Sequence, residues 1–174
     1  IVRDNSNKLF MYAKLLEDSL KFRKLELDGK KLELKDVEAL PVGLDSMYQS
    51  SFKRVFPEGD KDTSWLSSKD FITLIVSAQN RLTLDFVIDT LQWDKGAQEK
   101  VLGSTSLLFP LVKGRFSVFH KSVVDWLKGD AQQSSVSSTI VSTAYTFRIN
   151  KADEKLAHSR LFETSRRRNK GPVN

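Results

Sequence analysis

Apolar residues recur at intervals of three and four positions in several separate segments of this chain, and this spacing is typical of amphipathic helices. The first such segment covers residues 8–23. Residues 25–39 instead alternate leucine with charged residues around Asp28 and Gly29, which fits either a short hairpin or an irregular linker. The pattern therefore predicts one packing helix near the beginning of the chain and leaves the next segment undecided.

A second helical segment begins after Pro41 and Gly43, which interrupt the preceding chain, and it ends at Pro57 and Gly59. Its single apolar face consists of Leu44, Tyr48, Phe52 and either Val55 or Phe56. An aromatic stripe at this spacing is typical of a core face rather than of a cofactor site. The polar run 58–64 has no apolar anchor and is predicted to be an exposed loop.

Three further helices are predicted between residues 65 and 106. Ser67, followed three residues later by Asp70, resembles a capping box at the start of the first helix, and Thr83 is placed to cap the second. The third helix is expected at about residues 96–106. The apolar faces of the first two helices consist of Phe71, Leu74, Ile75, Ala78 and of Leu84, Val87, Ile88, Leu91.

Two short apolar strands are expected after the third helix, at residues 107–112 and 115–119, with Lys113 and Gly114 as the turn of a hairpin. From Phe119 onward the apolar residues change to helical spacing. Three helices, a hairpin and a closing helix follow one another in the order of a winged-helix domain. We therefore predict a mainly α fold, in which a helical connector is followed by a winged-helix domain with one small β-hairpin.

His120 lies at the junction between the second strand and the closing helix. Backbone N–H groups at a helix N-terminus lack intrahelical partners and carry the positive end of the helix dipole, so this position suits an anion such as a phosphate. The alternative is that the imidazole caps the hairpin or bonds a backbone carbonyl and meets no ligand.

The chain becomes polar after Asp130, which indicates a linker. Residues 144–149 can be extended, and residues 153–168 are predicted to form a helix on which His158 is exposed. Residues 129–174 hold eight basic and four acidic residues and contribute most of the net charge of +6. The run of Arg166, Arg167 and Arg168 can contact nucleic acid or anionic lipid, although such a run is more often only solvated.

Composition excludes several functional classes. With 40% hydrophobic and 29% charged residues, the chain is ordinary for a globular protein, and the absence of cysteine excludes thiol catalysis and cysteine-type zinc sites. It also fits a reducing compartment, so we expect a cytoplasmic protein. No apolar run approaches the roughly 20 residues that span a bilayer, and membrane insertion is not expected. Because the chain starts at Ile1 rather than at a methionine, we interpret it as a fragment of a longer protein.

No catalytic set is indicated for the fragment. The chain lacks the Gly-x-x-x-x-Gly-Lys-Ser/Thr loop of nucleotide-binding proteins, and no spacing suggests a Ser/His/Asp triad. With only two histidines, a multi-histidine metal site is not expected either. We therefore predict no catalytic residues, no metal ligands and no enzymatic activity for this segment by itself.

Three motifs together resemble the NACHT-type members of the STAND class of signal-transduction NTPases, in particular metazoan proteins that carry ankyrin, tetratricopeptide or WD repeats. The resemblance covers about residues 1–130. It rests on residues 40–44 with Tyr48, Phe52, Phe56 and Pro57, on residues 71–78 with 82–84, and on residues 119–127.

The resemblance implies a domain organisation. Residues 1–40 would be the C-terminal end of a NACHT-like module and a linker, and residues 41–64 the helical connector. Residues 65–130 would be the winged-helix domain. Residues 131–174 would be a linker and the start of a helical region, where relatives often begin their repeats.

The resemblance also implies a function. Related winged-helix domains present a histidine at this strand-to-helix junction to the β-phosphate of bound ADP, so His120 would bind that phosphate. The chain would be the regulatory arm that couples nucleotide state, closed with ADP and open with ATP, to scaffold or oligomer assembly. ATP or ADP with magnesium would bind to the upstream NACHT module, which is the expected partner in cis. Further protein partners would bind through downstream repeats.

Two alternatives remain open from the residues alone. One is a protein-interaction module that works without a nucleotide. The other is a winged helix that reads DNA, for which the third helix offers Lys95 and Lys100 but also Glu99. Because these charges are nearly balanced, a nucleic-acid partner is not expected.

Overall fold

The computed structural model of the chain describes residues 43–118, 120–129 and 147–170, together with residues 13, 16, 17, 19–21, 24 and 25. The chain divides into two compact units, Ile1–Phe52 and Lys53–Asn174. The segment 25–39 lies outside the described residues apart from Leu25, and so do the predicted domain boundaries at residues 40 and 130. The division into four domains therefore stays a prediction.

Helix α4 (Leu44–Val55) confirms the predicted second helical segment. It follows Gly43, whose backbone φ of +84° favours glycine because other side chains are strained in this region. Tyr48 and Phe52 are both buried, as the aromatic stripe predicted. The stripe thus belongs to a packed face.

The start of α5 (Thr63–Ser77) differs from the prediction. Most of the polar run 58–64 is exposed, as predicted, but it is not a loop: it contains the 3-10 turn η1 (Gly59–Lys61) and the first residues of α5. Asp62 is the N-cap, because its Oδ1 accepts hydrogen bonds from the backbone N–H groups of Ser64 at 2.7 Å and Trp65 at 3.4 Å. The capping box expected at Ser67 is therefore wrong.

The next elements follow the predicted order. Helix α6 (Leu84–Leu91) is capped by Thr83, whose hydroxyl accepts from the N–H of Phe86 at 3.3 Å, as predicted. Helix α7 (Lys95–Thr105) is capped by Asp94. Strands β1 (Leu111–Val112) and β2 (Arg115–Phe116) form an antiparallel pair that is shorter than expected. Lys113 and Gly114 both have positive φ, as a two-residue hairpin turn of type I′ requires.

The hairpin is also bonded to the segment between α5 and α6. Thr83 forms an antiparallel bridge with Arg115, and the N–H of Phe116 donates to the carbonyl of Leu82 at 2.8 Å. The Arg115 guanidinium donates to the carbonyl of Arg81 at 3.1 Å. These bonds hold β2 against the start of α6.

Two clusters of aromatic rings fill the core at different positions along α5. The ring of Phe71 lies 5.0 Å from that of Phe116, 5.5 Å from Trp93 and 6.1 Å from Phe109, between centroids. Trp65, at the other end of α5, lies 5.1 Å from Phe147 and 5.4 Å from Phe56. All but Trp93 are buried. The first cluster joins α5 to the hairpin, and the second joins α5 to the chain that leads into the last helix.

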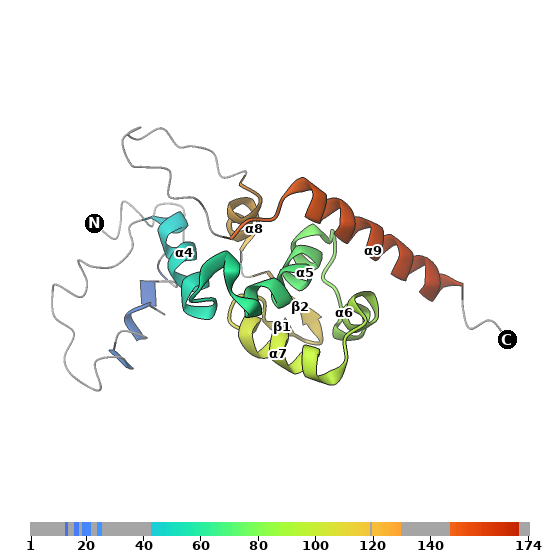
Figure 1. Cartoon of the computed structure of the whole chain (residues 1–174), viewed down its shortest axis with the longest axis horizontal. Helices are drawn as coiled ribbons and strands as arrows, with labels where there is room; N and C mark the ends of the chain where they lie inside the picture. The colour runs from blue at the N-terminus through green and yellow to red at the C-terminus, as the bar shows by residue number, and fades with distance from the viewer. Residues whose placement is uncertain are drawn as a thin grey trace. The chain divides into compact units, whose positions relative to one another are not determined.

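Helix α8 (Lys121–Lys128) follows the hairpin, and the last helix, α9 (Lys151–Asn169), confirms the helix predicted at residues 153–168. Figure 1 shows α9 running along α5 and α6. Asn150 and Asp153 cap its N-terminus in a capping box. Within the described residues the chain is thus mainly helical with one small antiparallel hairpin, as predicted, and none of these helices is long and apolar enough to cross a membrane.

The contact of α9 with the rest of the unit is mostly polar. Only Ala157 and Thr164 of this helix are buried. Four ion pairs between described residues surround them: Asp153 with Lys69 at 2.8 Å, Arg160 with Asp70 at 2.7 Å, Arg168 with Asp89 at 2.8 Å, and Glu154 with Lys128 at 2.6 Å. Arg168 also lies over the ring of Phe86, 5.2 Å from its centroid.

The Asp62 cap makes a pH dependence testable. Burial raises the pKa of this carboxyl, but hydrogen bonds from the N–H groups of Ser64, Glu58 and Trp65 and from the Ser64 hydroxyl lower it, and the net pKa is below 3.8. The folded pKa lies below that of the unfolded chain, so the stabilisation is present above about pH 4 and is lost as the pH falls through the folded pKa.

Asp62→Asn keeps an oxygen that can cap α5 but removes this titration. We expect urea unfolding to show a smaller loss of stability between about pH 6 and pH 3 in the variant than in the wild type. Equal losses in both proteins would contradict the role of the charged cap.

Candidate functional site

His120 is the N-cap of α8. Its backbone is extended, with φ −160° and ψ 151°, and its Nδ1 accepts a hydrogen bond from the N–H of Ser122 at 3.2 Å. The Ser122 hydroxyl lies 2.6 Å from the same nitrogen. The imidazole thus caps the closing helix, in keeping with the expectation that His120 lies at its start.

The cap determines which ring nitrogen faces outward. A nitrogen that accepts from a backbone N–H carries no proton, so a neutral ring in this geometry has its proton on Nε2. Nε2 has no hydrogen-bond partner among the described residues, and His120 is exposed. The side chain therefore offers one directed N–H donor to a group outside the helix.

The position of α8 is fixed by its other face. Val123, Trp126 and Leu127 are buried, as their spacing predicted. The helix ends at Gly129, which has φ +76° and donates its N–H to the carbonyls of Asp125 and Trp126. The positive φ at Gly129 favours glycine, because other residues are strained there. A carbon added at this position would also displace the guanidinium of Arg148, which is the movable end of a flexible side chain. With one face packed, His120 is held at the exposed end of the helix.

The surroundings of His120 favour an anion. Lys121, the first residue of α8, is exposed beside it. The helix N-terminus adds a partial positive charge, and the first acidic residue of α8 is Asp125, more than one turn away. Sequence reasoning selected His120 but missed Lys121 and Ser122. Ser122 could have been found, because the residue two positions after an N-cap supplies the N–H that is capped.

The other predicted features lie elsewhere. His158 is exposed on α9, a different element from α8. Two of the three tail arginines make contacts within the chain: Arg167 donates to the carbonyl of Asp89 at 3.4 Å, and Arg168 donates to the carboxylate of Asp89 and the carbonyl of Asp85. In the part of the chain that the structure describes, no cluster of three His, Cys, Asp or Glu residues is arranged to hold a metal.

Comparison with known proteins gives no further assignment: no family model, no curated protein and no solved structure matches this chain.

Substitution can separate the role of His120 as the cap of α8 from its role as an outward N–H donor. His120→Ala removes the cap and is expected to lower the free energy of unfolding by about 0.5–1 kcal/mol, whereas His120→Asn keeps a capping oxygen and should unfold close to the wild type. Chemical unfolding followed by tryptophan fluorescence measures both. If the two variants were equally destabilised, the side chain would not act as a cap.

Proposed function

We propose that this chain is the regulatory arm of a NACHT-type STAND NTPase, with a winged-helix domain formed by α5 to α8 and a helical connector that includes α4. The order of elements supports this fold. Three helices precede an antiparallel hairpin, a bridge at Thr83 pairs the α5–α6 segment with β2, and α8 follows the hairpin.

The geometry of His120 is the observation that carries the function. Nδ1 is engaged with Ser122, and Nε2 is directed away from the cap. An N–H donor beside a helix N-terminus and an exposed lysine suits one oxygen of a phosphate. The described residues around His120 thus fit a single contact to a bound nucleotide rather than a complete nucleotide-binding site.

The nucleotide and its magnesium ion would be held by an upstream module, because the chain has no phosphate-binding loop. His120 would dock the winged-helix domain onto that module in the ADP state and lose this contact in the ATP state. Such an arm is a two-state element whose equilibrium is set by the ligand. Its release would allow scaffold or oligomer assembly, while this segment itself performs no catalysis.

The DNA-reading alternative has less support. Lys95 and Lys100 are exposed on α7, but Glu99 is exposed between them and Asp94 caps the same helix. A helix with this charge balance makes few phosphate contacts. A nucleotide-independent interaction module remains the second candidate, and a specific surface for it is described below.

Two steps test the proposal. First, the coding sequence upstream of this segment should encode a Gly-x-x-x-x-Gly-Lys-Ser/Thr motif within about 300 residues, and its absence would refute the proposal. Second, the longer protein should be compared with its His120→Asn variant, in which α8 remains capped but the Nε2–H donor is lost.

We expect a fluorescent ADP analogue to dissociate roughly tenfold faster from the variant, because a hydrogen bond to a charged group contributes about 1.5 kcal/mol. Glu163→Gln on α9 is a surface control, from which the ADP analogue should dissociate at the wild-type rate. An unchanged dissociation rate in His120→Asn would show that His120 does not contact the phosphate of the nucleotide.

A further inference from the structure

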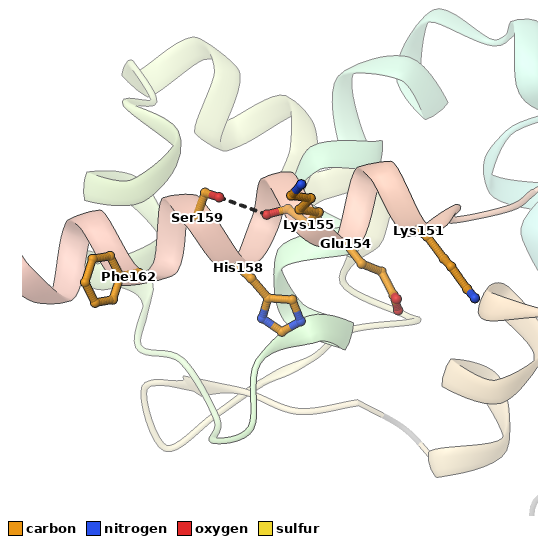
Figure 2. Close-up of a pocket in the computed structure, with 6 residues that line it drawn as sticks. All are labelled: Lys151, Glu154, Lys155, His158, Ser159 and Phe162. Carbon is orange, nitrogen blue, oxygen red and sulfur yellow. Dashed lines mark hydrogen bonds between the residues drawn. The ribbon is translucent and has the colours of Figure 1, made fainter.

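One exposed face of α9 combines basic residues with an aromatic ring. Its members are spaced four, three, four and four residues apart, so they lie on one side of the helix over about 22 Å. They are Lys151, Lys155, His158, Phe162 and Arg166, here called the α9 stripe, and all five are exposed. Figure 2 shows His158 and Phe162 projecting from the same side of α9.

The cations of the α9 stripe differ from those on the opposite side of the helix. Arg160 and Arg168 are paired with Asp70 and Asp89, whereas Lys151, Lys155 and Arg166 form no ion pair with the described residues. Of the carboxylates beside the stripe, that of Glu154 is paired with Lys128 of α8, and that of Glu163 is exposed three residues before Arg166. The α9 stripe therefore carries a net positive charge, and its three cations form no ion pair with the described residues.

An apolar feature lies in the middle of this charge. The side chain of Phe162 is 68% exposed, and it is the one aromatic ring among the large apolar side chains that are exposed in the described part of the chain. A shallow, open depression of about 560 Å³ extends along the same side and is lined by Lys151, Glu154, Lys155, His158, Ser159 and Phe162. The depression leaves the ring of Phe162 accessible to an apolar group of a partner.

We propose that the α9 stripe docks an acidic polypeptide segment with one large apolar side chain, its carboxylates meeting Lys151, Lys155 and Arg166 and its apolar side chain packing on Phe162. Charge complementarity selects an acidic partner, and the exposed ring selects one that also offers an apolar group.

Nucleic acid and membrane fit the same surface less well. Duplex DNA carries one charge per about 1.7 Å, and three cations over about 22 Å would match few of its phosphates. A helix that lies in a membrane surface needs a broad apolar face, but the α9 stripe has only Phe162, and the other side of α9 is packed on α5 and α6. The small area predicts a weak and transient complex.

The test uses the full 174-residue chain, labelled with ¹⁵N, and records amide shifts during titration with synthetic peptides. The main probe is a helical peptide of glutamate and alanine with one central leucine. Matched peptides replace the leucine with alanine or the glutamates with glutamine. Oligo-dT and vesicles that contain phosphatidylserine are separate arms.

We expect saturable amide shifts at Lys155, His158 and Phe162, with a dissociation constant of about 100 µM. The dissociation constant should rise as salt is added, because salt screens the charges. Phe162→Ser should weaken binding at least fivefold, and Lys155→Glu should do so as well. The peptide without leucine should bind the wild-type chain more weakly by a similar factor. Lys95→Glu, an equal charge change at an exposed residue of α7, should bind the acidic peptide like the wild type.

Several results would overturn the proposal. These are shifts centred outside α9, no shift at millimolar peptide, equal binding by the glutamine peptide, or tighter binding of oligo-dT or vesicles than of the acidic peptide. We expect α9 to be retained in each variant, because these substitutions leave its capping box and ion pairs untouched. Circular dichroism of each variant would verify the helix content.

Discussion

The second unit depends on the burial of α5. Seven consecutive residues of this helix, from Phe71 to Ser77, are buried, so the helix has no solvent face along its second half. A helix that is apolar on all sides is stable in water only when other elements cover it completely. Helices α6, α7 and α9 supply this cover, with the hairpin placed against Phe71 through Phe116. The arrangement of the other elements follows from this requirement.

The cover is not equally strong on all sides. Aromatic contacts hold the hairpin side, whereas α9 is held by Ala157, Thr164 and ion pairs whose side chains remain partly exposed. Pairs of this kind contribute about 0.2–1 kcal/mol each and are screened by salt. At its N-terminal end, α9 is tied more firmly, because Phe147 lies in the Trp65 cluster and the N–H of Ile149 bonds the carbonyl of Leu127. Among the described elements that cover α5, the far end of α9 is therefore expected to detach most easily.

Local signals in the sequence predicted most elements but not their long-range contacts. The cap at Thr83, the turn at Lys113 and Gly114, and the start of α8 at His120 each depend on neighbouring residues, and each is present. The start of α5 was misplaced because two polar signals competed, and the burial of Trp65 favours the earlier one at Asp62. The pairing of Arg160 with Asp70 spans 90 residues and has no local signal. For His120, the sequence predicted the position, whereas the bond between Nδ1 and Ser122, which leaves Nε2 without a partner among the described residues, is visible only in the structure.

Native-state hydrogen exchange tests this account of the core most directly. We expect the amides of Ile72, Leu74 and Ile75 to exchange only through global unfolding, and the amides in the last two turns of α9 to exchange faster. Raising the salt to about 1 M should accelerate α9 further, without a comparable effect on α5, because it screens the ion pairs. Equal protection of α5 and α9 at both salt concentrations would contradict the claim that α9 is held mainly by charge.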